Sequence, residues 1–292
     1  MITTKGQKVF RIFNYIIISI IVITTLYPFM HQLSVSMSTS DEAYRPGFHF
    51  FPKPGHITFS AYAQVFRSKL VWTGYMNSIL RALVGTLLAL LIYGMSAYPL
   101  SKDKLPFVKL ITTMFVISML FQGGLIPNYI LMKKLGLIDT RLVLMLQGIV
   151  SAFNIIVIRN FFKSLPEELE QSATIDGAGD LRIFFKIILP LSIPVMATIG
   201  LWTAVWHWNM WFDAMIFITK KEKQVLQIVL REILILSEGD LLSGMKMTEN
   251  RDYAQAQLKA AVIMVSVVPV MLIYPFIQKH FVKGIILGAV KG

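Results

Sequence analysis

The sequence contains no cysteine and few charged residues. Cysteine is absent from all 292 positions, which excludes a disulfide scaffold, a cysteine-ligated zinc or iron–sulfur site and a thiol nucleophile. Charged residues make up only 15% of the chain, whereas apolar residues make up 55%, above the roughly 45–50% of a soluble globular protein. With a mean hydropathy of +0.63, this composition argues against a disordered chain, a fibre and a typical soluble enzyme. It indicates an integral membrane protein.

Acidic residues are also scarce, because 16 Asp and Glu residues stand against 28 Lys and Arg residues, for a net charge of +12. A basic excess could serve nucleic-acid binding, but the basic residues form short clusters between apolar stretches and not a dense run. Such clusters are typical of groups near lipid headgroups. We therefore expect membrane lipid around the chain and no nucleic-acid partner.

Six stretches are long and apolar enough to be read as membrane-crossing helices, each of which needs about 20 such residues. Pro190 and Pro194 near the start of the fifth are tolerated where neighbouring helices satisfy the freed backbone groups. The expected fold is therefore all-α with six transmembrane helices. The stretches are Phe13–Met30, Ser78–Leu100, Val108–Leu131, Leu142–Phe162, Ile187–Phe217 and Ala260–Ile277.

The first apolar stretch follows three basic residues and could be taken for a secretory signal peptide. It is longer than the usual apolar part of such a signal, and His31-Gln32-Leu33 offers no small-residue cleavage site. We interpret residues 1–30 as an N-terminal tail and a retained membrane anchor. Lysine and arginine are denser in the connections on the side of the N-terminus, so both termini are expected on the cytoplasmic side.

The connections define the remaining parts of the expected organisation. Residues 31–76 form an outer segment punctuated by Pro and Gly, and residues 77–282 form the core membrane domain. Within that domain lie an inner loop, 163–186, and an outer loop, 218–259, and residues 283–292 form a cytoplasmic tail. The outer loop contains Leu226–Leu236, apolar enough for a helix that lies on the membrane or packs on the bundle, with or without an external partner.

The inner loop is read as two short helices joined by a turn. Ser164-Leu165-Pro166-Glu167 has the form of a capping box, which predicts a helix from about Leu165 to Ile175. Asp176-Gly177-Ala178-Gly179 then ends it, because glycine readily adopts the left-handed conformation of helix ends. Asp180 is expected to cap a second helix that leads into the fifth span. This helix–turn–helix suits a segment that receives force from a soluble partner.

At this loop the chain resembles the permease subunits of ATP-binding-cassette importers. Their motif has Glu-Ala-Ala, Gly and Ile-x-Leu-Pro at fixed spacings, matched here by Gln171-Ser172-Ala173, Gly177 and Ile187 to Leu189-Pro190. The Ile-Asp-Gly-Ala core at 175–178 is similar to the carbohydrate-uptake branch, in particular to the second permease of maltose-type and complex-oligosaccharide importers. Gln171 stands where the motif has glutamate, and Glu170 is turned about 100° around the helix, which puts a salt bridge from the motif position in doubt.

The resemblance implies a function and a set of partners. A second permease subunit, in a heterodimer, would share the pathway, two cytoplasmic ATPase subunits would grip the inner loop, and an external solute-binding protein would deliver a sugar or oligosaccharide. The expected location is a bacterial cell membrane, crossed several times. No Walker-type Gly-x-x-x-x-Gly-Lys-Ser/Thr is present, so ATP and Mg would be bound by the partner ATPases, and this chain would hold no cofactor and would not be an enzyme.

The residues expected to couple to the ATPases come from the inner loop and the start of the fifth span. For Asp176, capping of neighbouring N–H groups and pairing with a basic partner residue both remain open. The C-terminal tail could reach toward the ATPases or lie as a basic tail beside the headgroups. The coupling set comprises Glu170, Gln171, Ser172, Ala173, Asp176, Gly177, Ala178, Leu189 and Pro190.

One face of the fifth span is a candidate for the translocation pathway. Trp202, Trp206, Asn209 and Asp213 recur at i, i+4, i+7 and i+11, which predicts one helical stripe. Aromatic rings suit the C–H faces of sugars, and amides or carboxylates suit their hydroxyls, and Asn154 in the fourth span is a further candidate. The alternative is an interfacial tryptophan belt with Asn209 linking helices.

Three other classes of function compete with a sugar importer. An intramembrane enzyme would need a catalytic constellation, but the five histidines have no metal-ligand spacing and no catalytic or metal site is expected. A channel or receptor acting alone would need no ATPase partner. A permease for another solute class also remains open, although the long outer segments and the Ile-Asp-Gly-Ala core favour sugars.

Overall fold

The computed structural model describes residues 5–47, 49–102, 105–121, 123–235 and 255–289. These residues form helices of very different lengths, and within them the only β pairing is an isolated bridge between Ser38 and Ile57. The expected all-α class is confirmed at this level. The chain divides into two compact units, residues 1–72 with 230–269 and residues 73–229 with 270–292, and each unit is described by itself.

The first unit is built around the segment that follows the N-terminal helix. Helix α1 (Lys5–Ser36) is followed by α2 (Ser40–Ala43) and α3 (Ser60–Arg67), and α15 (Gln255–Ala289) begins in this unit. The Ser36 hydroxyl lies 2.8 Å from the Tyr62 hydroxyl, and the fully buried Gln257 side chain donates to the Ser38 carbonyl and accepts from the Ser40 hydroxyl. Side-chain hydrogen bonds therefore hold the backbone at residues 36–40 in place.

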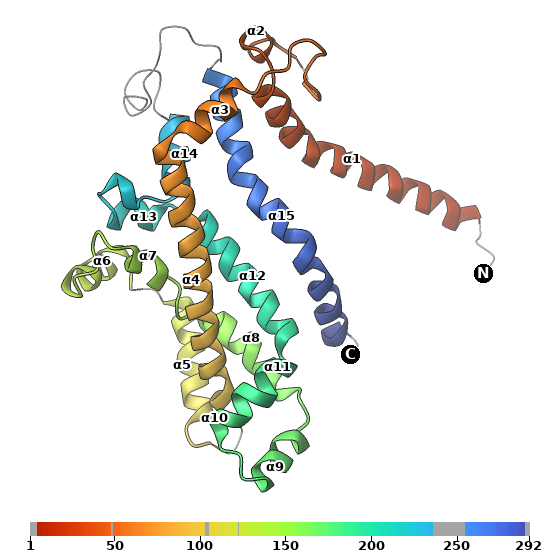
Figure 1. The fold of residues 1–292 in the computed structure, drawn as a ribbon. Helices are drawn as coiled ribbons and strands as arrows, with labels where there is room; N and C mark the ends of the chain where they lie inside the picture. The colour runs from red at the N-terminus through yellow and green to blue at the C-terminus, as the bar shows by residue number, and fades with distance from the viewer. Residues whose placement is uncertain (1–4, 48, 103–104, 122, 236–254, 290–292) are drawn as a thin grey trace. The chain divides into compact units, whose positions relative to one another are not determined.

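The second unit contains most of the helices, and α4 (Lys69–Leu100) runs along it (Figure 1). Leu100 ends this helix where the sequence predicts. The other elements are α5 (Val108–Leu120), α6 (Leu125–Lys134), α7 (Arg141–Leu146), α8 (Ala152–Lys163), α9 (Glu168–Ile175), α10 (Asp180–Ile183), a π-helical turn (Phe184–Ile188), α11 (Leu189–Leu191), α12 (Ile193–Asn209), α13 (Phe212–Phe217), a 3-10 turn (Lys221–Lys223) and the first four residues of α14 (Leu226–Ile235), whose other residues belong to the first unit.

Six continuous spans are not observed among the described residues. Three helices are long and apolar enough to cross a membrane alone, in α1, α4 and the Gln255–Leu272 part of α15, and up to five spans result if two bent helix pairs each count as one. Helix α15 continues through Ala289, so most of the expected tail 283–292 extends this helix. Helix α4 begins at Lys69, before the predicted end of the outer segment 31–76.

The third and fourth predicted spans are each divided between two helices. The third is divided into α5 and α6, which are bent by 112°, and Gly124 at φ +83° precedes α6. The fourth is divided into α7 and α8 by residues 147–151, where Gly148 has φ +71°. Apolar composition alone does not predict such breaks. A glycine inside an apolar stretch can adopt left-handed backbone without changing the hydropathy of the stretch.

The fifth predicted span, Ile187–Phe217, is also interrupted. The segment Asp180–Leu191 and helix α12 meet at an angle of 80°, beside Pro190 and Pro194. A second break at Met210 and Trp211 separates α12 from α13. Proline removes a backbone donor and clashes with the preceding turn, which explains the first of these two breaks.

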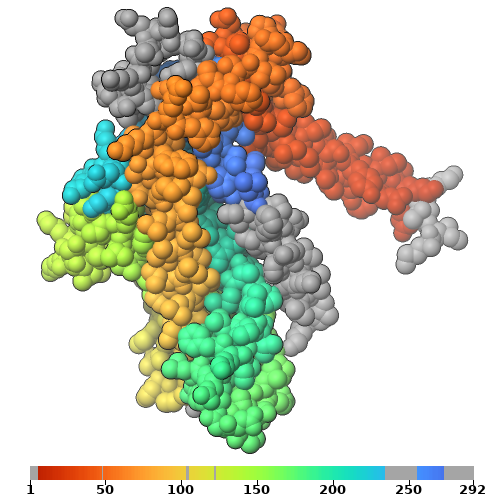
Figure 2. All heavy atoms as spheres, viewed as in Figure 1, coloured from red at the N-terminus to blue at the C-terminus, as the bar shows by residue number. Residues whose placement is uncertain are grey.

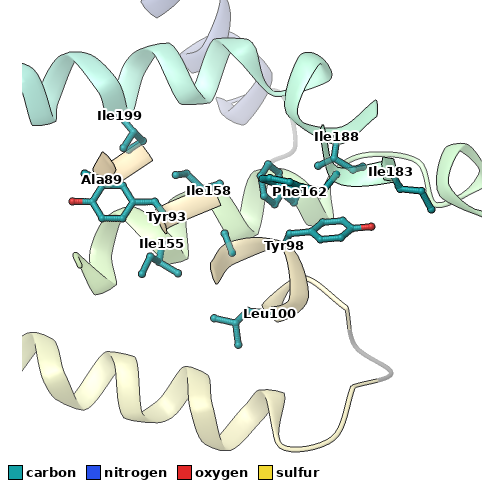
Figure 3. Packing of buried hydrophobic residues seen from close by; sticks show 12 residues of the cluster. Ala89, Tyr93, Tyr98, Leu100, Ile155, Ile158, Phe162, Ile183, Ile188 and Ile199 are labelled. Atoms are coloured by element: carbon teal, nitrogen blue, oxygen red, sulfur yellow. The ribbon is translucent and has the colours of Figure 1, made fainter. Parts of the chain in front are cut away.

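The core of the second unit lies where α4, α8 and the segment 183–199 pack together (Figure 3). Tyr93 and Tyr98 of α4 lie among isoleucine and phenylalanine side chains, with the Tyr98 ring 5.4 Å from Phe184 and 6.5 Å from Phe162 between centroids. This cluster rigidly joins α4 to the elements on both sides of α9, because well-packed interiors transmit displacement.

Polar contacts at the other end of α4 join it to the predicted outer loops. The Asn77 amide donates to the carbonyls of Glu222 and Gln224 at 3.0 and 2.9 Å and accepts from Arg141 at 2.8 Å, and the Ser78 hydroxyl accepts from the Leu226 N–H at 2.9 Å. Helix α14 confirms the predicted helix from Leu226. Its first residues are buried, so it packs on the protein.

Candidate functional site

Helix α9 is shorter than the sequence predicts at its N-terminus. The capping box is wrong, because α9 begins at Glu168 after Glu167 and no side chain caps it. The Ser164 hydroxyl instead donates to the Phe161 carbonyl at 2.7 Å, at the end of α8. Ser164 therefore completes the preceding helix, since a serine hydroxyl can satisfy local backbone carbonyls as readily as it caps a helix start.

The C-terminus of α9 is where the sequence predicts, at Ile175, and glycine ends it. Gly177 has φ +78°. Its N–H donates to the Thr174 carbonyl at 3.0 Å, and the Ala178 N–H donates to the Ala173 carbonyl at 2.9 Å. This is a Schellman motif, which needs left-handed backbone at the glycine. No heavy atom lies within 4 Å of the position that a Cβ on Gly177 would take, so conformation and not crowding selects glycine here.

The predicted caps on either side of this turn are not formed. Asp180 does not cap α10, since Gly179 occupies the cap position and Asp180 is the first helical residue. Within the described residues the Asp176 carboxylate accepts no hydrogen bond, so of the two roles left open for it, only pairing with a basic partner residue stays a prediction. Both carboxylates are exposed on the turn.

The candidate coupling residues divide between an inner and an outer side of the loop. Ala173 and Ala178 are half-buried against the core cluster, and Leu189 is half-buried near them. Exposed members are Gln171, Ser172, Asp176, Gly177 and Pro190. Large apolar side chains accompany them at the surface, namely Leu169 (41% exposed), Ile175 (87%) and Leu181 (66%). Helix α9 lies at the surface of the second unit in Figure 2. Several large exposed apolar side chains close together are typical of an interaction surface.

Glu170 does not point outward with these residues. Its carboxylate forms an ion pair with Lys102, just beyond the end of α4, and accepts a hydrogen bond from the Tyr98 hydroxyl at 3.1 Å. The Lys102 ammonium lies 4.4 Å from the centroid of the Tyr98 ring, within cation–π range. Partial burial lowers the pKa of Lys102, while the nearby carboxylates of Asp180 and Glu167 oppose this shift.

The candidate pathway residues do not form one stripe. Trp202, Trp206 and Asn209 share an exposed face of α12, with the two indoles 42% and 39% exposed. Asp213 lies beyond the break at Met210 and Trp211, on α13, and is only 5% exposed. The prediction of a single stripe is wrong for Asp213, because the i+11 spacing holds only along an unbroken helix.

Asp213 belongs instead to a buried ion pair with Arg81 of α4. Both Asp213 oxygens accept from the guanidinium, which also donates to the Met210 carbonyl at 3.0 Å. The Arg81 Nε lies 3.5 Å from Nδ1 of His207. The guanidinium thus satisfies the carbonyl that the α12–α13 break leaves free, as a buried backbone group requires.

The break between α7 and α8 lies against the exposed face of α12. A Cβ on Gly148 would come within 2.9 Å of the Trp206 indole, so the ring rests on the glycine backbone. The Tyr93 hydroxyl donates to the Gly148 carbonyl at 2.5 Å. The Gln147 side-chain nitrogen is buried without a hydrogen-bond partner among the described residues. Irregular backbone at Gly148 therefore lies next to an aromatic ring.

Helix α8 extends this aromatic surface. Phe153, 50% exposed, stacks on Trp202 with centroids 6.3 Å apart and planes inclined by 28°. Asn154 follows it and is half-buried. We call Gly148, Phe153, Trp202, Trp206 and Asn209 the aromatic face. Their arrangement offers flat apolar rings beside amide and carbonyl groups, which is the chemistry that a sugar ring requires.

Several residues that contact the predicted ones were not expected from the sequence. Arg81, Lys102 and Tyr93 were not singled out, and Phe153 was passed over as one of 20 phenylalanines. A charged residue inside an apolar span, as Arg81 is, was a usable signal, since such groups are expected to be paired or functional. Among the described residues, no group of three or more His, Asp or Glu side chains could hold a metal ion.

Comparison with known proteins agrees with this architecture. Residues 6–287 match the model of a family described as binding-protein-dependent transport system inner membrane component. The protein LplC of Bacillus subtilis is 39% identical over 292 residues, which cover all of this chain and 98% of LplC. The polygalacturonan/rhamnogalacturonan transport system permease protein YtcP of the same bacterium is 38% identical, with 97% and 99% of the two chains covered.

A solved structure shows the same fold. One chain of a bacterial ABC transporter involved in the import of the acidic polysaccharide alginate superposes with a TM-score of 0.89 at 33% sequence identity, covering 96% of this chain and 99% of that one. The chain therefore belongs to the family of binding-protein-dependent transport system inner membrane components, and it is a permease subunit of an ABC importer, a transport subunit and not an enzyme.

Proposed function

We propose that this chain and a second permease subunit form the pathway by which an oligosaccharide, delivered by an external binding protein, enters a bacterial cell. Two cytoplasmic ATPase subunits, which bind ATP and Mg, would grip α9 and drive the cycle. The observation that carries this proposal is an exposed, glycine-terminated helix set between α8 and the α10–α12 segment, in a chain that matches the family over residues 6–287.

The charge distribution supports a cytoplasmic position for α9. Basic side chains gather where α4 and α8 end and α10 begins, and such residues favour the cytoplasmic side of a membrane. This assignment places both termini in the cytoplasm if all six predicted spans cross. The basic residues at this end are Lys102, Arg159, Lys163, Arg182 and Lys186.

The exposed side of α9 is the proposed surface for the ATPase. Leu169 and Ile175 offer apolar contacts, and Gln171, Ser172 and Asp176 offer polar ones beside them. Because Gly177 and Gly179 lack a Cβ, a partner could approach the backbone of the turn closely. Helix shape and exposure support this role, and they do not require a charge at position 171.

The aromatic face is the proposed lining of the pathway. Tyr93, which donates to the Gly148 carbonyl, lies roughly 10 Å along α4 from its end at Leu100, at 1.5 Å per residue. The break at 147–151 would therefore lie within the hydrocarbon thickness. Irregular backbone at that depth is tolerated only where it is buried in protein or lines a water-filled cavity. A water-filled pathway at the aromatic face, with Asn154 near it, would satisfy this requirement, whereas lipid there would not.

Relatives suggest which saccharides to test. YtcP is named for polygalacturonan and rhamnogalacturonan transport, and the solved neighbour imports alginate, so both handle acidic polysaccharides. We propose that the substrate is an oligosaccharide, with acidic oligosaccharides first among the candidates. Permeases for other solutes remain the alternative.

The direct test is uptake by the complete complex in proteoliposomes with its binding protein. We expect ATP-dependent uptake of galacturonate or alginate oligosaccharides, and binding-protein-dependent uptake of only a non-sugar solute would contradict the proposal. Trp206→Ala should lower uptake about two- to tenfold, the range of a lost aromatic contact, while the ATPase still co-purifies. Trp206→Phe, which keeps a ring, is the matched control. Normal uptake by Trp206→Ala would return this residue to packing.

A further inference from the structure

Besides the apolar contact of Ala173 with the core cluster, α9 has a polar contact with the rest of the second unit at one charged residue. Lys102 lies directly after α4, and its ammonium pairs with Glu170 of α9. The Tyr98 hydroxyl donates to the same carboxylate, and the ammonium sits over the Tyr98 ring. Each of the three side chains thus contacts the other two. The Lys102 and Glu170 side chains are 30% and 22% exposed.

Two further acidic residues of the loop act on the same cation through their charge. Glu167 immediately precedes α9, and Asp180 begins α10. Their charges act on Lys102. Lys102 therefore attracts carboxylates from before, within and after α9, and it lies where it can hold the whole loop against the end of α4.

The covalent connections of α9 are weaker mechanical links. On its C-terminal side the chain passes through Gly177 and Gly179, and no heavy atom lies within 4 Å of the position of a Cβ on either. On its N-terminal side it passes through the non-helical residues 164–167. Without a side-chain contact between α9 and a membrane-spanning helix, a displacement of α9 would be absorbed by these two flexible connections.

We propose that Glu170, Lys102 and Tyr98 form an intramolecular latch that ties α9 to the end of α4, so that α4 moves with α9 during transport. This inference rests on the proposed function of α9 as the ATPase-docking helix. In this proposal Glu170 is a positioning residue that acts within its own chain. The outer side of α9 contacts the ATPase.

The position of Glu170 explains why an uncharged residue can stand next to it. Gln171 is exposed, whereas Glu170 is turned about 100° around the helix from it and pairs with Lys102. The charged anchor of the loop is therefore on the inner side. Its interaction is needed even when no ATPase is bound.

The latch can be tested without transport because the chain has no cysteine. Spin labels placed at Thr174→Cys on α9 and Met95→Cys on α4, both exposed and neither in the proposed ATPase surface, report the distance between the two helices in the assembled complex. We expect Glu170→Lys and Lys102→Glu each to broaden this distance distribution, and the double exchange Lys102→Glu/Glu170→Lys to narrow it again. Unchanged distributions in both single variants would overturn the latch.

A second measurement links the latch to coupling. In proteoliposomes, each single charge reversal should lower substrate uptake per ATP hydrolysed. The expected loss is up to about fivefold, which is the equilibrium ratio that corresponds to the strongest solvent-exposed ion pairs. The double exchange should restore the uptake. The ATPase should still co-purify with every variant. Glu168→Lys, on the outer side of the same helix, is the matched control and should leave the distance distribution unchanged.

The two proposals fail in different ways. Loss of the ATPase from Glu170→Lys without recovery in the double exchange would show that Glu170 contacts the ATPase, and would overturn the latch. Absence of ATP-driven saccharide uptake by the unmodified complex would overturn the proposed function, while the distance measurement would still decide whether α9 is tied to α4.

Discussion

Two ion pairs in the same unit differ in burial and in what they can do. Arg81 and Asp213 have side chains 1% and 6% exposed, whereas Lys102 and Glu170 are 30% and 22% exposed. The first pair joins α4 to α13 across a helix break, and the second joins α4 to α9. A buried pair is costly to separate because each charge would be left without solvent or partner. A half-exposed pair exchanges with water at little cost.

This difference separates a fixed joint from one that can be strained during a transport cycle. The buried pair also binds the Met210 carbonyl, so it holds the backbone at the end of α12. The half-exposed pair holds only side chains. We infer that the end of α4 near Arg81 stays rigid with α12 and α13, while the end near Lys102 can respond to its partner.

The largest expected effect is at the buried pair. Asp213→Asn removes one charge and leaves the Arg81 guanidinium buried without its counter-charge, which should destabilise the protein by about 3–5 kcal/mol. Thermal unfolding of the purified complex in detergent measures this loss. A change below about 1 kcal/mol would show that water reaches this pair and would remove the contrast with Lys102 and Glu170.

A double variant serves as its control. Arg81→Met/Asp213→Leu replaces both charges with apolar groups, and such replacements are often neutral or stabilising. It should unfold closer to the unmodified protein than Asp213→Asn does. A double variant as unstable as the single one would show that the hydrogen bond to Met210, and not the charge pair, is the main contribution.

The next effect concerns the glycine that ends α9. Gly177→Ala places a Cβ in left-handed backbone, which costs roughly 1–2 kcal/mol with no steric clash, because the surroundings are open. We expect weaker substrate-stimulated ATPase activity with normal membrane insertion. Gly177→Asn is the matched control, since asparagine tolerates this conformation. Equal loss in both variants would mean that a partner contacts the glycine directly.

Removal of the half-exposed charge should have a smaller effect on stability. Lys102→Met keeps the aliphatic chain over Tyr98 and should change the free energy of unfolding by less than about 1 kcal/mol, several-fold less than Asp213→Asn. Thermal unfolding of the two variants side by side measures the ratio. Comparable losses would contradict the distinction between a fixed and a strainable pair.

The smallest effect is expected at Asp139, a carboxylate near the surface. It accepts hydrogen bonds from the N–H groups of Thr219 and Lys220 at 2.7 and 3.1 Å and from the Thr219 hydroxyl at 2.5 Å. The bonds from Thr219 come first among the causes that lower the pKa of Asp139 below its ordinary value of 3.8.

This lowered pKa gives a pH dependence of known sign. Because the folded-state pKa is below the unfolded one, the stabilisation is complete above about pH 3.8 and is lost as the pH falls through the lower folded value. The difference in unfolding temperature between the unmodified protein and Asp139→Asn should therefore be constant near pH 7 and shrink below pH 3.8. A difference that persists unchanged at pH 3 would contradict this explanation.

Local rules were sufficient for some elements and failed for others. The end of α4 at Leu100 and the end of α9 at Ile175 follow from a polar stretch and from a glycine, respectively, both of which act within a few residues. Ser164 failed as a predicted cap because the same hydroxyl can bond to the carbonyl of Phe161. Two local uses of one side chain have similar free energies, so the pattern alone could not choose between them.

The sequence by itself determined that this is an all-helical membrane protein with a glycine-terminated short helix in the polar segment 163–186, because composition and backbone preference are local properties. Only the tertiary structure decided where the apolar runs break and which polar groups meet. Arg81 and Asp213 are separated by 132 positions, and Lys102 and Glu170 by 68. Pairing over such distances depends on how the helices pack, and no periodicity along the chain encodes it.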